Sequence, residues 1–505
     1  MKSSIVDVLK KEMTLFTFPV IVNNLPSIDG LLCGQREIIY AMDKANMNSN
    51  GQFYKMLKAA GVVYNYYVLG DSGLTGSMKN MGNNYSLNKY LLPKGSFGNK
   101  NLRDGNGSAP RYIECKLSPY SECMLEGINK NAVQMKDNYD ATEKEPVILP
   151  SKIPNILCNL RTSIAVSEAN TMPSHNMEDV CDSIISYIKT NNIDKSIELL
   201  KVPDLPSGGA IIYDKKTFDK IYKTGKGSFI NIGKYKYIKE KNMISIYEIP
   251  YNTVIENIYD EIKNNYSKFQ SEISSISNGS DKNGLNLRIY LKKGANVDVV
   301  IQKLRKYTSY ESKFKCNFTI LDLDGKTPIL MNLETIITKW LEHRTSCLIR
   351  ETNFDIKEQS KLLNRLYGLK IINEDLDKAI SIIRSSKNEN IAKELLKKEF
   401  NLNDEQLNYI CTIKLVNINH DWITKRITNI DEIENKIEYL NHFKNDKNSI
   451  NNKIIEQLNE VKNKFKKARQ TEIIYEDNIK PISKQDLIED CNYRLAYTST
   501  YIKKY

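Results

Sequence analysis

The segment most suggestive of chemistry is Ser108-Ala109-Pro110-Arg111-Tyr112-Ile113, in which an arginine directly precedes a tyrosine. A guanidinium offers a fixed fork of donors that fits phosphate oxygens. A phenol, with a pKa of about 10, becomes a good nucleophile only when nearby charge or a metal ion lowers that pKa. The pair therefore suits attack on a phosphodiester, although most of the 30 tyrosines in the chain must serve packing or the surface.

The charge balance favours a polyanionic partner. The chain of 505 residues has 73 Lys and Arg against 61 Asp and Glu, a net charge of +12, and nucleic acid is the leading candidate. Its richness in Lys, Asn and Ile could instead reflect a biased genome. Between residues 61 and 107, basic side chains alternate with tyrosines and glycines, a texture that suits a phosphate backbone but also a solvated loop; they are Lys79, Lys89, Lys94, Lys100 and Arg103.

Cysteine and histidine usage argues against several classes of protein. The nine cysteines contain no CxxC pair and the four histidines are dispersed, which disfavours a disulfide framework and a zinc site. The longest apolar stretch near the N-terminus, Met13 to Val22, contains Thr and Pro and lacks a cleavage signal. We therefore expect a soluble, cytoplasmic protein with no membrane association.

Hydrophobic periodicity divides the chain into regions. An N-terminal arm at 1–26 includes a short amphipathic helix, and further helices are predicted at 35–42 and from 53 to about 60. From 146 to 330 short alternating runs predict half-exposed strands, for example at 225–233 and 243–250.

The remaining third of the chain is helical in pattern. Apolar residues recur at helical spacing from 332 to about 467, which predicts long helices with a continuous apolar seam. A compact helical piece at about 390–419 interrupts them, so we infer an antiparallel arm tipped by a small globule. Such a seam is also typical of plain core or of an intramolecular hairpin.

Three short motifs have simpler explanations. Gly70-Asp71-Ser72-Gly73 is similar to the serine turn of trypsin-like proteases, but every histidine follows residue 174 and the order is wrong for that triad. Leu321 to Lys326 contains two spaced carboxylates, and a β-turn with Asp-Gly at its apex is favoured over a phosphatase or metal motif. Gly225-Lys226-Gly227-Ser228 lacks the spacing of a P-loop.

Several segments, taken in chain order from about residue 15 to 475, resemble the motifs of one family. That family is the DNA breakage-reunion subunit of the type IIA DNA topoisomerases, which include gyrase, topoisomerase IV, the eukaryotic enzyme and the split phage enzymes. The matching segments are Leu25–Leu31 with Gly34-Gln35-Arg36 ("LP…DGLKPGQR"), Gly95–Gly98 ("GQ/NFG"), Ser108–Ile113 ("SA.RY"), Asp137–Pro146 with Leu149–Leu157 ("DNYDGTEKIP…LPTKIPNLL"), Pro203–Pro206 ("PDFPT"), Glu248–Tyr251 ("TEIPY") and Lys467–Ile473 ("RRTEI").

The resemblance implies a specific reaction. Tyr112 would attack a backbone phosphorus and become joined to the 5′ phosphate, and Arg111 would hold the developing negative charge. The family's acidic metal cluster, "EGDS" followed by "DxD", does not occur in this chain. Mg²⁺ and ATP hydrolysis would therefore belong to a separate ATPase and metal-binding subunit.

The resemblance also implies DNA-contacting residues. Arg36 matches a family arginine that contacts DNA near the cut. Ile153, within Lys152-Ile153-Pro154, is assigned as the isoleucine that wedges between base pairs and bends the duplex, with ordinary core as the alternative. The remaining expected contacts to double-stranded DNA come from Lys58, Lys100, Arg103 and Ser72.

The implied fold is multidomain α+β. A winged-helix, CAP-like domain with Tyr112 would span 27–145, an α/β tower domain 146–330, and a coiled-coil arm 331–475, whose globule forms a dimeric exit gate. A tail would fill 476–505. Two copies of this chain would cut both DNA strands, and they would form a heterotetramer with the ATPase subunit.

Since about thirty residues follow 475, we expect no β-propeller. We therefore expect relaxation or decatenation of DNA rather than efficient supercoiling. The composition favours a phage or virus.

The chain departs from the family at positions near the expected site. The "YH(P)HG(D/E)" segment aligns with Tyr66 to Asp71, so Tyr67 and Leu69 replace its histidines, and Leu32 and Cys33 replace the lysine and proline of "DGLKP". The glycines of "NGSSGIAVG" become Leu160, Ser163 and Ser167. These changes keep open an alternative, a catalytically silent DNA-binding or scaffold relative.

Overall fold

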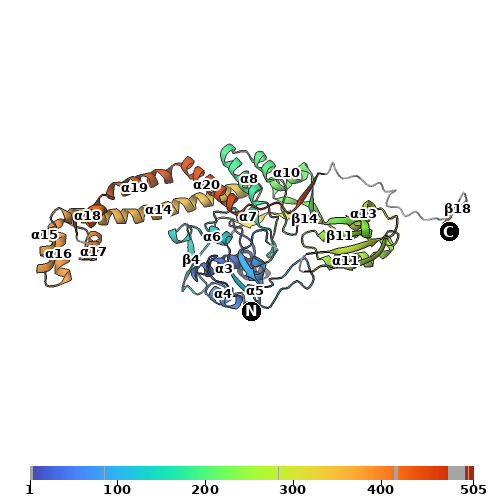
Figure 1. The fold of residues 1–505 in the computed structure, drawn as a ribbon, viewed down its shortest axis with the longest axis horizontal. Coiled ribbons are helices and arrows are strands. Elements are labelled where there is room, and N and C mark those ends of the chain that lie inside the picture. Colours follow the sequence, from blue (N-terminus) through green and yellow to red (C-terminus); the bar gives the residue numbers. More distant parts are fainter. Residues whose placement is uncertain are drawn as a thin grey trace. The chain divides into compact units, whose positions relative to one another are not determined.

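The computed structural model describes residues 4–84, 86–281, 284–414, 419–475, 495–498 and 500–504. It is a multidomain α+β chain, as predicted, and divides into two compact units (Figure 1). Unit 1 comprises residues 1–124, 135–340 and 460–505, and unit 2 comprises 125–134 and 341–459. In the described part of the chain no helix is both long and apolar enough to cross a bilayer.

The N-terminal arm forms a short helical run of α1 (Ile5–Asp7), η1 (Val8–Glu12) and α2 (Met13–Asn24). The sequence predicts an amphipathic helix here, but the apolar side chains of α2 are spread around the helix. Along the whole arm, seven apolar side chains between residues 5 and 18 are 44–77% exposed: Ile5, Val6, Leu9, Met13, Leu15, Phe16 and Phe18. The chain enters the core only at Leu25.

A three-stranded antiparallel sheet and four helices follow. The strand order is β1 (Tyr54–Lys55), β3 (Glu114–Leu117), β2 (Leu91–Lys94). The helices are α3 (Cys33–Lys44), α4 (Met56–Val63), α5 (Asp71–Gly82) and α6 (Pro119–Leu125). Ile38, Ile39 and Met42 of α3 are buried at helical spacing, which confirms the helix predicted at 35–42 and explains why it forms.

A six-stranded sheet forms the centre of unit 1. Its order is β17 (Glu472–Tyr475), β8 (Ala210–Tyr213), β9 (Lys226–Ile232), β14 (Glu311–Asn317), β7 (Ala169–Met172), β6 (Arg161–Ile164). β17 pairs with β8 in parallel, so the end of the arm returns to this sheet. The nearby helices are α7 (Asn155–Cys158), α8 (Met177–Thr190), α9 (Ile193–Leu200) and α10 (Lys215–Thr224), and a small hairpin joins β4 (Met135–Asp137) to β5 (Lys144–Pro146).

A four-stranded sheet with its own core completes the mixed region. Its order is β10 (Lys234–Ile238), β11 (Met243–Glu248), β13 (Leu287–Leu291), β12 (Ile273–Asn278). Helices α11 (Ile255–Asn264), α12 (Tyr266–Phe269) and α13 (Val297–Tyr307) pack their buried apolar side chains with this sheet. η3 (Lys239–Lys241) links β10 to β11. Strands β9 and β11 confirm the strands predicted at 225–233 and 243–250.

The carboxylates at 322 and 324 lie in a β-turn, as predicted. This turn joins β15 (Thr319–Leu321) to β16 (Pro328–Leu330). The Gly325 N–H donates to the Asp322 carbonyl at 2.8 Å, and Gly325 has a φ of +67°, a conformation that glycine adopts readily. Asp324 accepts from the backbone of Lys326 and Thr327, so its carboxylate serves the turn.

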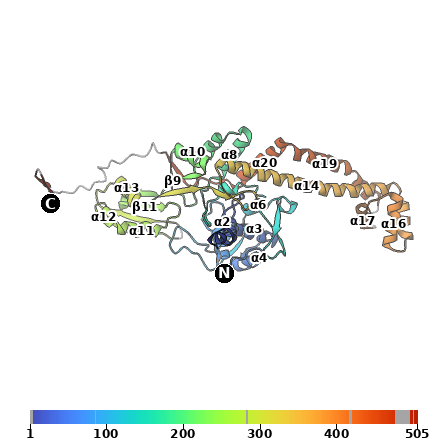
Figure 2. The same cartoon turned by 180° about the vertical axis from the view of Figure 1, so that it is seen from behind.

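Unit 2 is helical, which confirms the long helices predicted from 332 onward. α14 (Leu333–Asn373) begins in unit 1 and continues into unit 2, and within unit 2 it lies beside α19 (Ile430–Asn445) in both ribbon views (Figures 1 and 2). Leu366 of α14 packs with Ile430 and Ile433. The other elements are η2 (Ile128–Lys130), α15 (Leu376–Ser385), α16 (Glu389–Phe400), α17 (Asp404–Cys411), α18 (His420–Ile427) and α20 (Lys447–Phe465), the last of which ends in unit 1.

The globule begins earlier in the chain than the sequence suggests. A separate core joins the end of α14 to α15–α17, and its buried residues are Ile372, Ala379, Leu396, Leu402, Leu407 and Ile410. The expected span was 390–419, of which 415–418 lie outside the described residues. The difference arises because α15 has the same helical pattern as the arm but packs into the globule.

Most of the expected tail, including 476–494, also lies outside the described residues. In its described part, β18 (Leu495–Tyr497) pairs with β19 (Ile502–Lys504).

Candidate functional site

Tyr112 lies on a tight turn that immediately precedes β3. Its N–H donates to the Ala109 carbonyl at 2.9 Å, and the side chain is 65% exposed. The next residue, Ile113, is 1% exposed, and its carbonyl accepts from the Met56 N–H at 3.0 Å. A buried anchor therefore holds the backbone while the phenol points to solvent, an arrangement in which a nucleophile can meet a large substrate.

Arg111 rests on the ring that follows it. The guanidinium carbon of Arg111 lies 4.8 Å from the ring centroid of Tyr112, and both side chains are exposed. An arginine at this distance over an aromatic face is attracted by the ring quadrupole. The donor fork and the phenol, which the sequence predicts to act together, are thus neighbours in space.

The loop before this turn depends on close backbone contacts. A Cβ on Gly107 would lie 2.6 Å from the Gly98 nitrogen, and both glycines have positive φ, at +71° and +97°. The Ser108 N–H donates to the Ser96 carbonyl at 2.9 Å, and Lys79 of α5 donates to the Asn106 carbonyl at 3.3 Å. The Gly-rich loop is therefore fixed to α5 and positions Arg111 and Tyr112.

A basic cluster lies two residues beyond Tyr112. Glu114 pairs with Lys55 at 2.9 Å and with Lys94 at 2.8 Å, because β1 and β2 flank β3. Hydrogen bonds from Lys94 and Lys55 lower the pKa of Glu114 to about 2. Lys116 and Lys94 also lie 4.7 and 5.7 Å from the ring centroid of Phe53. Of these three lysines, the sequence analysis named only Lys94. Alternation along β3 puts Glu114 and Lys116 on one face, and this pattern is the signal that would have identified Lys116.

Arg36 does not lie on a surface that DNA could reach. It is 6% exposed, and its Nε and Nη2 donate to Asp29 Oδ2 and Oδ1 at 2.8 and 3.0 Å. Burial alone would raise the pKa of Asp29, but the Arg36 charge and the hydrogen bonds from Arg36, Leu149 and Leu31 hold it below its usual value. The DNA contact expected of Arg36 is thus replaced by a buried ion pair, because the motif that carries the arginine also carries its carboxylate partner.

Ile153 is likewise buried, at 0% exposure. A side chain in the core cannot enter a base step unless its segment unfolds, so the structure supports the ordinary-core alternative for this residue. Ile164, at the end of β6, is instead 77% exposed at a hairpin closed by the Ala165 N–H donating to the Glu168 carbonyl. Sequence reasoning missed Ile164, although Ile164-Ala165-Val166 keeps the "IAV" of the family motif.

The other expected DNA contacts differ in their surroundings. Lys58 is exposed with its Nζ 5.0 Å from the Tyr54 ring centroid, and Lys100 and Ser72 are exposed, the latter in the first turn of α5. Arg103 donates to Asp260 at 2.7 Å and to Asn257 at 3.1 Å. Its charge is therefore paired with α11. The sequence does not reveal this contact, because Arg103 and Asp260 are 157 positions apart.

The segment that replaces the family histidines is split between core and surface. Tyr67 is 7% exposed, and a Cβ on Gly34 would lie 2.7 Å from its ring. Val68 and Leu69 are 60% and 61% exposed. The Tyr64 hydroxyl donates to Asp71 at 2.6 Å. The surface thus presents Leu69 where the resemblance places a histidine, with the apolar Val68 beside it.

Cys33, a second departure, is buried and its thiol donates to Glu37 at 3.2 Å. Burial, reinforced by the Glu37 charge, raises the pKa of Cys33 to about 12. Burial also raises the pKa of Glu37 to about 7. Because the thiolate is the reactive form, Cys33 is an inert core residue at neutral pH.

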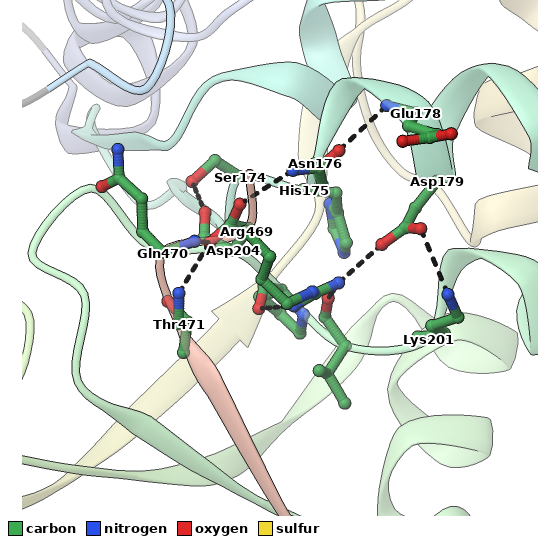
Figure 3. Close-up of polar contacts among 12 residues, drawn as sticks. Ser174, His175, Asn176, Glu178, Asp179, Lys201, Asp204, Arg469, Gln470 and Thr471 are labelled. Atoms are coloured by element: carbon green, nitrogen blue, oxygen red, sulfur yellow. Dashed lines mark hydrogen bonds and ion pairs between the residues drawn. The ribbon is translucent and has the colours of Figure 1, made fainter. Parts of the chain in front are cut away.

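The returning segment at 467–473 is fixed by a polar network (Figure 3). Arg469 donates to Asp179 at 2.6 Å and to the carbonyls of Pro203 and Val202 at 3.0 Å each. Asp204 accepts the N–H groups of Gln470 and Thr471 at 3.0 and 2.9 Å. These contacts place β17 beside β8, so two motifs that are far apart in sequence form one structural joint.

His175 is buried beside this network. Its Nδ1 and Nε2 lie 3.1 Å from the Leu157 carbonyl and 2.9 Å from the Tyr222 hydroxyl. Burial lowers the pKa of His175 to about 3. The imidazole is therefore neutral near pH 7 and serves packing.

The described residues do not offer a metal site. Within those ranges, no group of three or more His, Cys, Asp or Glu side chains is placed to hold a metal ion.

These features define a multidomain α+β protein whose small basic sheet displays an arginine-tyrosine pair. The chain belongs to the family of the A subunits of DNA gyrase and topoisomerase IV, whose sequence profile matches residues 24–459.

Proteins with similar sequences are A subunits of the same family. The chain is 32% identical to the A subunit of DNA topoisomerase 4 from Streptococcus pneumoniae serotype 4 over 492 residues, covering 95% of this chain and 59% of the relative. It is also 32% identical to the A subunit of DNA gyrase from Leptospira biflexa, covering 96% and 58%, and to that from Metamycoplasma arthritidis, covering 98% and 56%. The chain thus spans rather more than half the length of these relatives.

Proposed function

We propose that this chain is the DNA cleavage and religation subunit of a type IIA topoisomerase. The observation that carries the proposal is the exposed Tyr112 with Arg111 against its ring, on a turn anchored by buried Ile113. The basic side chains of Lys55, Lys94 and Lys116 beside it supply the positive surface that a DNA backbone needs.

In the proposed reaction Tyr112 gives up its phenolic proton to solvent water, and its Oη attacks a backbone phosphorus. The bond from phosphorus to the 3′ oxygen breaks, and that oxygen becomes a hydroxyl by taking up a proton. Arg111 leaves the Tyr112 ring and donates to the phosphate oxygens as negative charge develops. One phosphodiester replaces another, so religation is the reverse step and needs no ATP.

We assign Mg²⁺ and ATP hydrolysis to a separate subunit. The reason is the resemblance, in which an acidic cluster holds the metal, because that cluster does not occur in the sequence of this chain. The complete enzyme in this proposal is a heterotetramer of two copies of this chain and two ATPase subunits.

The domain roles follow the resemblance. Residues 27–145 would form the winged-helix domain, 146–330 the tower, and 331–475 the arm. Dimerisation through the globule is supported by its exposed apolar side chains, since α15 and α16 leave Ile380, Ile383, Ile391 and Leu395 38–45% exposed. Exposed apolar groups on neighbouring helices are typical of a protein interface.

Ile164 is the residue that we assign to DNA bending. Proteins that kink DNA insert an apolar side chain between base steps, and Ile164 is an apolar side chain exposed at a hairpin tip. Ile153, fully buried, is not proposed for this role.

The test of the proposed function is covalent trapping. The chain is mixed with its ATPase and metal-binding partner, supercoiled DNA and magnesium, and then denatured with detergent. DNA linked to Tyr112 through a 5′ phosphate is the expected product, and a Tyr112→Phe variant should bind DNA without forming it. Cleavage that persists in that variant would place the nucleophile elsewhere.

A second candidate function is a DNA-binding or scaffold relative without cleavage. It is favoured by the exposed Val68 and Leu69, which stand where the family has a phosphate-binding histidine segment. Absence of any adduct, together with DNA binding that weakens steeply with salt, would support this alternative.

A further inference from the structure

A cavity of about 690 Å³ lies in unit 1, apart from Tyr112. Four segments that are distant in sequence line it. They contribute Asn84, 86–89 and Leu92; 118–120 at the start of α6; Pro206; and Phe465, Lys467 and Gln470 at and beyond the end of α20. Its volume is within the range of small-molecule sites, about 300–1,000 Å³.

The charged groups of this cavity are all of one sign. None of its described lining residues is acidic, and two are lysines, Lys89 and Lys467. Within the described ranges neither ammonium has a carboxylate partner; Lys467 Nζ donates to the Leu87 carbonyl at 3.0 Å and to Asn88 Oδ1 at 3.5 Å. Burial lowers the pKa of Lys89, and burial together with the charge of Lys89 lowers the pKa of Lys467. The two cations are therefore close enough to repel, and an anion between them would relieve that repulsion.

The rest of the cavity suits a flat apolar body. Tyr120 is 3% exposed and meets Phe465 edge-on, with ring centroids 5.4 Å apart. Leu87, Leu92 and Pro206 extend this wall. Aromatic walls favour planar ligands through stacked or edge-on contacts.

We infer that this cavity binds a small anion with a planar body, whose phosphate or carboxylate head lies between Lys89 and Lys467 and whose ring lies against Tyr120 and Phe465. A nucleoside monophosphate and an aromatic carboxylate share this chemistry. The site is separate from DNA cleavage and does not depend on it.

Isothermal titration of the full chain tests the inference with four probes. Adenosine monophosphate and 2-naphthoate carry the anionic head, and adenosine and 2-naphthylmethanol are their uncharged counterparts. The anions should bind one per chain and at least about tenfold more tightly than the uncharged partners, a difference of about 1.4 kcal/mol. Tighter binding of the nucleotide or of the naphthoate shows which source of anion fits better.

Variants separate this site from general positive charge. Lys89→Gln and Lys467→Gln should each weaken anion binding about tenfold, as expected for the loss of one charge-assisted contact. Lys216→Gln, at an exposed lysine of α10, should leave it unchanged. Circular dichroism melting checks that each variant is folded. If Lys467→Gln does not fold, the Lys89→Gln variant tests the inference by itself.

Three results would overturn the inference. The first is equal binding of charged and uncharged probes, which would indicate a merely apolar cavity. The second is an unchanged affinity in both lysine variants. The third is full displacement of the bound anion by a short DNA duplex, which would assign both lysines to a DNA surface.

Discussion

The guanidinium carbon of Arg111 lies 4.8 Å from the ring centroid of Tyr112, so the arginine is held on the side chain that it is proposed to assist. This contact keeps the donor fork next to the phenol before DNA arrives. It also gives the proposed nucleophile a neighbour whose removal can be measured separately from the tyrosine itself.

Replacing Arg111 should slow cleavage without preventing DNA binding. Arg111→Gln is expected to lower the rate of adduct formation by about 10²–10³, the usual cost of one lost donor to a developing charge. Arg111→Lys should recover part of that rate, since it restores charge but not the fork. Quenched-flow measurement of the DNA–protein adduct checks this, and equal rates for all three proteins would contradict it.

The Arg36–Asp29 pair should contribute to stability. Arg36→Met leaves the Asp29 carboxylate buried without its partner and should lower the free energy of unfolding by about 3–5 kcal/mol. The double variant Arg36→Met/Asp29→Asn should be less destabilised, because it leaves no unpaired charge. Denaturant unfolding of the full chain is the measurement. A folded Arg36→Met protein with full stability but weakened DNA binding would instead support the original assignment of Arg36 as a DNA contact.

Ile164 and Ile153 form a matched pair for the bending hypothesis. Ile164→Ala should change stability by no more than about 0.5 kcal/mol but reduce the bend of bound duplex, measured by energy transfer between dyes on the DNA ends. Ile153→Ala should cost about 2–5 kcal/mol of stability, as for other buried large-to-small changes. Wild-type bending in Ile164→Ala would contradict the assignment.

His175 should make stability depend on pH. Its folded pKa, about 3, lies below its unfolded value of about 6.5, so the unfolded state binds the extra proton. This contribution is fully present above pH 6.5 and falls by at most about 1.4 kcal/mol per pH unit as the pH decreases toward 3. Glu37, with its pKa raised by burial to about 7, acts in the opposite direction between pH 7 and 4.5.

Comparison with a variant isolates the histidine contribution. His175→Gln should lose less stability than wild type between pH 6.5 and 4.5, measured as the shift of the thermal midpoint at each pH. His442→Gln, at an exposed histidine of α19, is the control and should follow the wild type. Parallel pH profiles for wild type and His175→Gln would show that His175 does not titrate in this way.

The globule should hold two copies together. Ile383→Asp and Leu395→Asp place charges among the exposed apolar groups of α15 and α16, where they would be desolvated in an interface. Sedimentation should show a shift from dimer to monomer, while Tyr439→Asp, an exposed site on α19, should not cause one. A wild-type chain that is monomeric at micromolar concentration would contradict dimerisation through the globule.

Sequence alone determined the features that depend on local pattern. The helices from 332 onward, the strands predicted at 225–233 and 243–250, and the Asp-Gly turn at 324–325 appear in the structure as expected. The order of the motifs was sufficient to indicate the family. The helices, the strands and the turn are each set by neighbours within a few positions, and so they can be predicted from the sequence.

Only the tertiary structure decided which motif residues face solvent. Ile153 lies in a matched family motif and Ile164, eleven positions later, in a segment that departs from the family, yet Ile153 is fully buried and Ile164 is 77% exposed. Arg103 pairs with Asp260, and β17 lies against β8 from more than 250 positions away. Burial and ion pairing are determined by the segments that pack around a side chain, and those segments are distant in sequence, so local spacing does not encode them.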